Sequence, residues 1–292
     1  MYSTKSIISA IGASTLGGLA YMAISGSSRI TRPRRSLPEA TPDHIGFNWE
    51  PIGIQSADGT ELSAWLIPNS ATSAAIIVLH GFGGNKGTML NIVQTLAPGF
   101  NVLALDVRGH GESGGTWTSV GHYERYDAIA AAQELRLRGF GPIGVLGISM
   151  GAAISILAAA ESPLIRAVVA DSSFAVLRHA VRGNARLLGY PSLMAELAAY
   201  TACSAVAARL RHARTASDPI AAIAHIAPRP TLLIHCDGDA MIPVTDAQAL
   251  YAASGDPCEL WIIPEMAHAE SYAGATDEYR ARVTRFFRRH LQ

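Results

Sequence analysis

The sequence predicts one α/β domain built on a mostly parallel, eight-stranded sheet with helices on both faces. Short, continuous apolar runs alternate with helix-like segments, a pattern typical of parallel strands that are covered on both sides. An Asp-Gly turn near the start joins two further strands and gives the sheet an antiparallel beginning. The chain has 292 residues, of which 49% are hydrophobic. That length is ample for a buried core of this kind.

The first 28 residues are expected to stand apart from this domain. Residues 6–28 contain no charged side chain, and a helix of about 20 apolar residues spans a bilayer. Four arginines follow the stretch and one lysine precedes it, so the positive-inside rule predicts a single membrane anchor with the domain in the cytoplasm. The alternatives are a signal peptide cleaved after residues 23–25, with export of the domain, and a buried helix.

Residues 29–43 hold three prolines and four arginines and are predicted to form a linker, which leaves 44–292 for the domain. The segments 47–56 and 61–68 are expected to pair as the hairpin. The apolar runs predict strands at 74–80, 101–107, 142–148, 165–171, 230–236 and 258–264. The segments between them predict helices near 85–97, 121–138, 150–161, 245–254 and 274–290.

One interval, residues 173–228, is much longer than a single crossover helix requires. It is rich in alanine, leucine and arginine and is expected to form two or three helices. Because it follows a strand, it is predicted to be a short lid over the strand ends.

Composition excludes several classes of function. The formal net charge is zero, which gives no reason to expect a nucleic-acid partner. The three cysteines form no C-x-x-C pair, and no cluster of histidine and cysteine has metal-ligand spacing, so neither a metal nor another cofactor is predicted. Cys236 ends one predicted strand and Cys258 begins the next parallel one, which places them roughly 20 Å apart and too far to form a disulfide.

The stretch Gly147-Ile-Ser149-Met-Gly151 lies where a predicted strand passes into a predicted helix. It matches G-x-S-x-G, in which a sharp, strained turn exposes a nucleophilic serine and small neighbours let the turn close. The amides of the following helix point at the same place. A second match at 111–115 has loop sequence on both sides, so Ser149, and not Ser113, is the predicted nucleophile.

A serine nucleophile needs a general base, and the base needs a carboxylate that orients it. His268 lies in the predicted loop after the last strand. Among the competing histidines, His290 lies on the predicted terminal helix, His179 and His212 fall in the lid, and His225 precedes a strand. Asp237 and Asp239 follow the strand that ends at Cys236, and Asp171 ends the strand before it. The residues alone leave this choice of acid open.

Together these motifs resemble the α/β-hydrolase superfamily over residues 47–290. Residues 235–243 match the pattern H-G-x-x-D-x-x-[VI]-P, which implies that the acid is Asp239, although Cys236 stands where the family has glycine. Some relatives carry the acid one strand earlier, which keeps Asp171 as the alternative. The order Ser149, Asp239, His268 is the order of the superfamily.

Two further loops carry the resemblance. Residues 79–86 match the loop whose backbone completes an oxyanion hole, which implies that the amides of Phe82 and Met150 are the two donors and that His80 braces the loop. Residues 105–113 match D-x-R-G-H-G-x-S and are interpreted as a structural loop. The resemblance favours the membrane-tethered, esterase- and serine-aminopeptidase-like branch.

The function implied is that of a serine hydrolase, which cleaves a small-molecule carboxylic ester through an acyl-enzyme and needs no cofactor. A peptidase or amidase with the same triad is the alternative. A non-catalytic, membrane-attached binding protein is a third possibility; such a protein is expected to lose a triad residue, and none is missing from this sequence.

Overall fold

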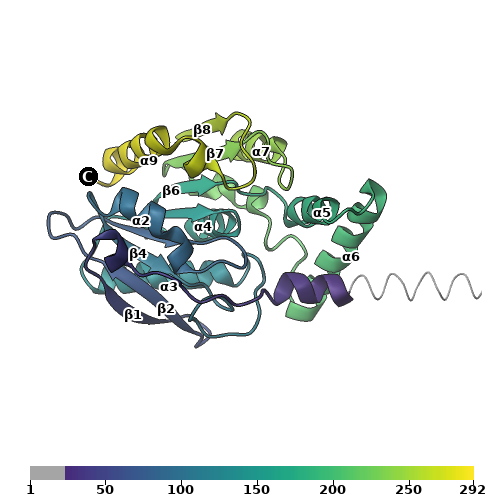
Figure 1. Cartoon of the computed structure of the whole chain (residues 1–292), viewed down its shortest axis with the longest axis horizontal. Coiled ribbons are helices and arrows are strands. Elements are labelled where there is room, and N and C mark those ends of the chain that lie inside the picture. Colours follow the sequence, from purple (N-terminus) through teal and green to yellow (C-terminus); the bar gives the residue numbers. More distant parts are fainter. Residues whose placement is uncertain (1–23) are drawn as a thin grey trace, which may run out of the picture.

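A computed structural model describes residues 24–292, and the eight strands in this part of the chain form one sheet (Figure 1). Their order is β1-β2-β4-β3-β5-β6-β7-β8. Only β2 runs against the others, since it pairs antiparallel with both of its neighbours. The predicted sheet, with its antiparallel beginning, is confirmed. The bounds are β1 (Glu50–Gln55), β2 (Glu61–Ile67), β3 (Ala75–Leu79), β4 (Asn101–Leu105), β5 (Ile143–Ile148), β6 (Ile165–Asp171), β7 (Thr231–Cys236) and β8 (Cys258–Ile263).

Helices cover both faces of the sheet and create two apolar cores. In β3, Ile77 and Leu79 point into one core, and Ile76 and Val78 point into the other, as the period of two in a strand requires. The first core is closed by α3 (Glu124–Leu137), α4 (Met150–Glu161) and α7 (Val244–Ala253). The second is closed by α2 (Leu90–Leu96) and α9 (Thr276–Leu291). Short turns of helix are η1 (Pro42–Ile45), η2 (Lys86–Met89) and α8 (Ser271–Gly274).

Parallel pairing brings the carboxyl ends of five neighbouring strands, β3 and β5 to β8, to one edge of the sheet. The loops that leave this edge carry all of the predicted site residues. The register also separates the two strand cysteines, because Cys236 pairs with Ile263 and Cys258 pairs with Thr231 at the other end of the same two strands. Both thiols are free.

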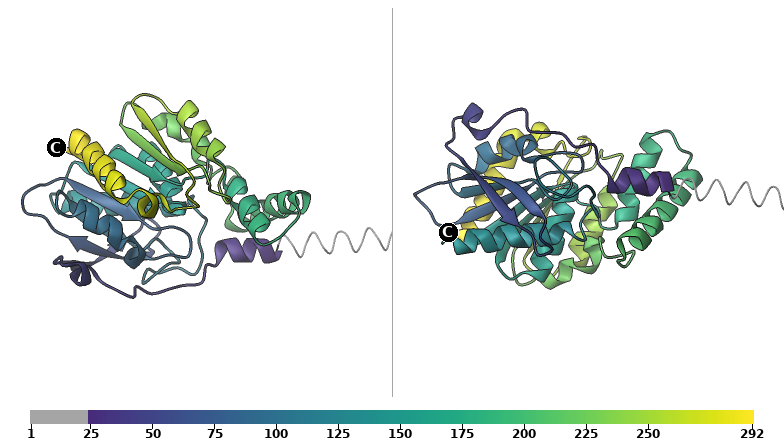
Figure 2. Two further views of the ribbon diagram at one scale, coloured as in Figure 1. Left: turned by 45° about the horizontal axis from the view of Figure 1, so that its top comes forward. Right: turned by 90° about the horizontal axis from the view of Figure 1, so that it is seen from below.

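The interval 173–228 contains two α-helices, α5 (Leu177–Leu187) and α6 (Ser192–Leu210), followed by the short helices η3 (Pro219–Ala221) and η4 (Ile223–Ile226). The helices α5 and α6 pack on each other and stand out from the layered body (Figures 1 and 2). We refer to this pair as the lid.

Residues 24–31 form a helix that lies beside α6 in all three views (Figures 1 and 2). A Cβ on Gly26 would lie 2.9 Å from Cβ of Ala202, so the approach requires glycine. The carbonyl of Thr31 accepts a hydrogen bond from the Thr118 amide at 2.9 Å. Residues 29–31, predicted as linker, are therefore helical, and the irregular chain begins at Arg32, just before the first proline. Residues 1–23 of the predicted anchor or signal segment lie outside the described residues. Residues 24–28, which were expected to stand apart from the domain, instead belong to the helix that packs on α6.

Candidate active site

The turn between β5 and α4 explains the two glycines around Ser149. Ser149 has φ 56° and ψ −114°, a conformation that costs a non-glycine residue about 1–3 kcal/mol. A Cβ on Gly147 would overlap the carbonyl of Gly151, and a Cβ on Gly151 would overlap the carbonyl of Leu79. The Ser149 amide donates to the carbonyl of Asp171 at 2.8 Å. The strained turn is thus held by its neighbours, and its serine projects from the sheet edge.

The turn brings the Ser149 hydroxyl to the loop after β8. Ser149 Oγ lies 2.9 Å from Nε2 of His268, and Nδ1 of the same ring lies 2.5 Å from Oδ2 of Asp239. The carboxylate is an acceptor, so Nδ1 carries the proton and Nε2 is left to accept from the serine hydroxyl. The three side chains predicted as a triad are therefore brought together in one hydrogen-bonded chain.

The carboxylate of Asp239 is fully buried and satisfied on both oxygens. Oδ1 accepts from the amides of Met241 and Ile242, each at 2.8 Å, and Oδ2 accepts from His268. Burial alone would raise the pKa of Asp239, but these hydrogen bonds and the imidazole lower it overall. The group is therefore a charged, fixed acceptor near neutral pH.

The two rival carboxylates have other partners. Asp237 accepts a hydrogen bond from the Glu265 amide at 2.7 Å and ties the loops after β7 and β8 together. Asp171 is buried and accepts from the hydroxyls of Ser172 and Ser271, at 3.0 and 2.7 Å. Burial raises the pKa of Asp171. Neither is hydrogen-bonded to His268.

The loop after β3 reaches the same point. A Cβ on Gly81 would lie 3.5 Å from Cβ of Ser149, so the backbone at 81–82 borders this serine. The amides of Phe82 and Met150 have no hydrogen-bond acceptor within the described chain. His80 is buried, and its Nδ1 donates to the Gly81 carbonyl at 2.8 Å while Nε2 faces the Val107 amide at 3.3 Å. Burial lowers the pKa of His80 to about 4, so the ring is neutral and supports the loop.

The second serine motif is structural. Ser113 is buried; its hydroxyl donates to the Asp106 carbonyl at 2.5 Å and accepts from the Ser63 amide at 2.8 Å. Beside it, the fully buried Lys86 pairs with Asp106 and with Glu112, both at 2.6 Å. This ion pair fixes the start of α2 beneath the sheet edge and was not anticipated from the sequence.

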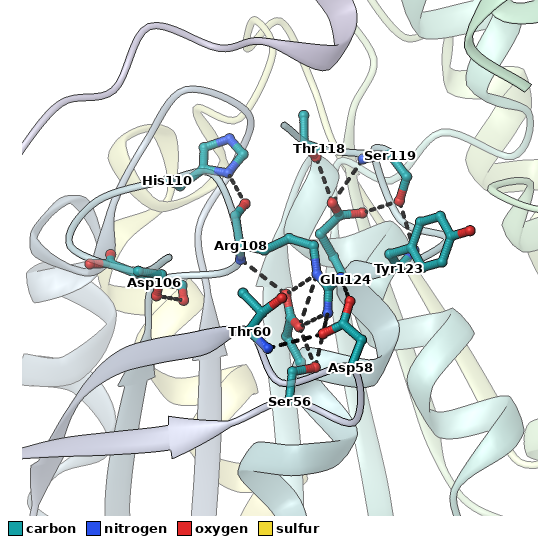
Figure 3. A network of polar contacts seen from close by, with 12 residues as sticks. Ser56, Asp58, Thr60, Asp106, Arg108, His110, Thr118, Ser119, Tyr123 and Glu124 are labelled. Carbon is teal, nitrogen blue, oxygen red and sulfur yellow. Dashed lines mark hydrogen bonds and ion pairs between the residues drawn. The ribbon is translucent and has the colours of Figure 1, made fainter. Parts of the chain in front are cut away.

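A second buried network shapes the next loop (Figure 3). Arg108 pairs with Asp127 and with Asp58, each at 2.6 Å. Glu124 accepts hydrogen bonds from the side chains and amides at 118–121. Val120 in that loop lines the pocket above Ser149, so the network sets the shape of the pocket wall and agrees with the interpretation of 105–113 as structural.

The pocket over Ser149 and His268 has a volume of about 550 Å³. Most of its lining is apolar, with side chains from the sheet edge and from α5: Met89, Val120, Phe174, Leu177, Val181 and Met241. Arg29 and Ile30, from the helix at 24–31, complete the lining. Sequence reasoning missed these two residues, because it assigned them to a linker. The uncharged run that continues to Ser28 was the only sign that a helix reaches this far.

Comparison with known proteins agrees with this geometry. A family model described as alpha/beta hydrolase fold matches residues 74–219. The chain belongs to the alpha/beta hydrolase fold family. Relatives of this hydrolase include the uncharacterised proteins YqkD of Bacillus subtilis, 32% identical over 244 residues covering 80% of this chain and 77% of that one, and YfhR of Escherichia coli, 29% identical over 249 residues covering 81% and 80%. Human monoglyceride lipase is 34% identical over 137 residues, 45% of each chain.

Among solved structures, the chain is similar to the Pyrococcus furiosus esterase Pf2001. The TM-score is 0.76 at 27% identity, over 90% of this chain and 99% of the esterase. Acylaminoacyl peptidase of Pyrococcus horikoshii has a TM-score of 0.63 at 20% identity, over 84% of this chain and 42% of the peptidase; that likeness concerns the fold.

Proposed function

We propose that the protein is a serine esterase that cleaves carboxylic esters through an acyl-enzyme. The observation that carries the proposal is the continuous hydrogen-bonded chain from Asp239 through His268 to Ser149, open to an apolar pocket. The similarity to an esterase of known structure supports the same class of reaction.

In the proposed first half-reaction, Nε2 of His268 takes the proton of Ser149 as Oγ attacks the ester carbonyl. The negative charge that develops on the carbonyl oxygen is stabilised by the amides of Phe82 and Met150, worth about 3–4 kcal/mol each in comparable sites. Asp239 stabilises the imidazolium. His268 then gives the proton to the departing alkoxide, which leaves as an alcohol, and the acyl group stays on Ser149.

In the second half-reaction, a water molecule gives its proton to His268 and attacks the acyl carbonyl. Collapse of the second tetrahedral intermediate breaks the bond to Oγ, which regains the proton from the imidazolium, and the carboxylic acid leaves. We favour esters over amides because an alkoxide is a better leaving group than an amine. The apolar lining favours an apolar acyl chain.

The test compares wild type with Ser149→Ala, using Ser113→Ala as the matched control in the second G-x-S-x-G stretch. The substrates are p-nitrophenyl acetate, butyrate and decanoate and an aminoacyl p-nitroanilide. Ser149→Ala is expected to lower kcat on the esters by at least about 10³-fold, as for other serine triads, while Ser113→Ala stays active if folded. Equal rates in wild type and Ser149→Ala would refute the esterase. Anilide cleavage without ester cleavage would assign the site to a peptidase.

We also propose that residues 6–23, the uncharged segment before the helix that packs on α6, attach the protein to a membrane. The proposal rests on the uncharged sequence and on the arginines at 29, 32, 34 and 35, which favour a cytoplasmic domain. Within residues 24–292, one helix, α6 of the lid, is long and apolar enough to cross a bilayer by length and composition alone. Retention of the full-length chain in carbonate-washed membranes is expected; release of a shortened mature chain would show signal cleavage.

A further inference from the structure

The lid carries an unusual concentration of exposed apolar side chains. Of the twelve large hydrophobic residues that are exposed among residues 24–292, seven lie between 187 and 200. They come from the end of α5, the turn after it and the first half of α6: Leu187, Leu188, Tyr190, Leu193, Met194, Leu197 and Tyr200. We call this surface the lid tip. Leu193 is 80% exposed, so the lid tip lacks a cover in the described structure.

The helix α6 is apolar on both of its sides. Its inner side is made of small buried residues, Ala195, Ala199 and Ala202, which let α5 and the helix at 24–31 approach closely. Its outer side presents Leu193, Leu197 and the neighbouring apolar side chains. A surface helix in water normally turns polar residues outward, so this outer side requires an apolar partner.

The lid and the turn after it are rich in arginine. Between residues 177 and 218 the sequence has six arginines and two acidic residues, Glu196 and Asp218, within a chain of zero net charge. Asp218 accepts a hydrogen bond from the Leu177 amide at the start of α5. Glu196 pairs with Arg178 and Arg182. The other arginines have no ion-pair partner within residues 24–292, and two of them border the apolar surface: Arg186 precedes Leu187, and the guanidinium of Arg214 lies 4.7 Å from the ring centre of Tyr200.

The chain enters the domain beside this same surface. The helix at 24–31 lies along α6 (Figures 1 and 2), and its first residue, Ile24, is 67% exposed. Residues 6–23, which precede it in the sequence, contain no charge. A long apolar sequence therefore joins the structure next to an apolar, basic face.

From these observations we propose that the lid tip docks on an anionic phospholipid bilayer, with its leucines and aromatic rings in the interface and its arginines at the headgroups. Apolar side chains rimmed by arginine are the composition of interfacial helices, which bind by apolar burial and by attraction to anionic lipids. A second copy of this basic face would repel the first, which favours lipid as the occupant.

Docking in this way gives the active site a lipid-side entrance, a consequence that rests on the proposed esterase function. One side of α5 lines the pocket through Leu177, Val181 and Asn184. Leu188 of the lid tip lies on the same side, because these positions follow one another at spacings of three and four residues. An ester dissolved in the bilayer would follow this side of α5 to Ser149. We infer that the substrate is an ester that partitions into lipid.

The first test reads docking without requiring hydrolysis. The full chain carries Ser149→Ala and either Leu193→Cys or Leu137→Cys, labelled with an environment-sensitive nitrobenzoxadiazole dye; the Ser149→Ala chain without an added cysteine gives the background from the native thiols. Leu137 is the matched control, because it is 83% exposed but lies on α3, outside the lid. Vesicles of phosphatidylcholine with phosphatidylglycerol are expected to shift the emission of the dye at 193 to the blue and to leave that at 137 unchanged.

Vesicles of phosphatidylcholine alone, or high salt, are expected to reduce the shift. The proposal is overturned if the dye at 193 shows no vesicle-dependent shift. It is equally overturned by a blue shift without vesicles that grows with protein concentration, since that result would assign the lid tip to contacts between copies of the chain.

The second test separates docking from chemistry. Leu193→Glu with Leu197→Glu places two charges on the lid tip, at residues that do not line the pocket. The rate on a decanoyl ester held in vesicles, divided by the rate on soluble p-nitrophenyl acetate, is expected to fall at least about tenfold, because a single buried leucine contributes about as much as a tenfold change in partitioning. An unchanged ratio would overturn the lipid entrance. Absence of hydrolysis in wild type would reject the esterase and leave the fluorescence test of docking intact.

Discussion

Replacing Asp239 with asparagine changes one atom in the series of hydrogen bonds that runs from residue 239 through His268 to Ser149. The oxygen Oδ1, which accepts from the amides of Met241 and Ile242 at 2.8 Å, is retained by the amide side chain. In the variant an NH₂ group replaces Oδ2 and faces Nδ1 of His268. In the wild type this Nδ1 lies 2.5 Å from Oδ2 of Asp239. Two donors cannot share a hydrogen bond, so the ring is expected to move its proton to Nε2. Nε2 then has no lone pair for the Ser149 proton.

The expected loss in kcat is about 10⁴-fold, the size observed when the same tautomer is disfavoured in another serine triad. This loss equals about 5.5 kcal/mol of transition-state stabilisation. Because Asp239 does not line the pocket, the KM for a short ester is expected to change little. A large change confined to KM would contradict the assigned role.

The assay is hydrolysis of p-nitrophenyl butyrate, with Asp171→Asn as the control at the same sheet edge. Burial raises the pKa of Asp171, and its partners are Ser172 and Ser271, so asparagine there is expected to keep kcat/KM within about threefold of wild type. The reasoning fails if Asp171→Asn loses as much activity as Asp239→Asn, or if Asp239→Asn keeps wild-type kcat.

Three further changes test the surrounding structure. Gly151→Ala places a Cβ against the backbone at the end of β3. The variant is expected to lower kcat/KM at least about 100-fold, because the added atom displaces Ser149. A fully active variant would contradict the close approach. Lys86→Met leaves buried Asp106 without its cation and is expected to lower the free energy of unfolding, measured in urea, by about 3–5 kcal/mol. The control Arg282→Met removes an exposed ion pair and is expected to lower it by less than about 1 kcal/mol. Equal losses would be inconsistent with the burial of Lys86. Asp58 has a pKa of about 2, because hydrogen bonds from Arg108 outweigh the effect of burial, while an aspartate in the unfolded chain has a pKa of about 3.9. The stabilisation that charged Asp58 provides is therefore present above about pH 4 and is lost as the pH falls towards 2. The difference in unfolding free energy between wild type and Asp58→Asn is expected to shrink over that pH range.

The strands were readable from the sequence because the sheet is buried on both faces. A run such as Ala75–Leu79, in which every residue is buried, leaves little room for another interpretation once turn residues bound it. The helix after β3 was less well predicted, because residues 86–89 form a 3-10 turn before α2 begins at Leu90. There the Asn85 side chain accepts from the Gly87 amide, a local cap that an apolar pattern does not register.

The choice of Ser149 and His268 as candidate nucleophile and base followed from position along the chain, since a strand-to-helix turn and the loop after the last strand are local features. The acid did not. Asp237, Asp239 and Asp171 all lie at one sheet edge, and the residues alone do not say which carboxylate faces His268. The resemblance to a known family pointed to Asp239, and the observed contact at 2.5 Å agrees with it.

Contacts between segments that lie far apart in the sequence could not be predicted from it. The burial of Lys86 depends on Asp106 and Glu112 arriving from another loop. The role of Arg29 and Ile30 in the pocket depends on a helix that packs across the lid. Neither contact leaves a periodic pattern within its own segment, and the composition of residues 29–43 indicated only a linker.

The pocket wall formed by Arg29 and Ile30 has a practical consequence for anyone who prepares this protein. Recombinant versions that begin at the first proline would lack Arg29 and Ile30, and with them part of the pocket lining. Under the proposed esterase function, the shortened forms are expected to accept bulkier acyl groups than the full chain, so chain-length preferences measured on them would reflect the truncation.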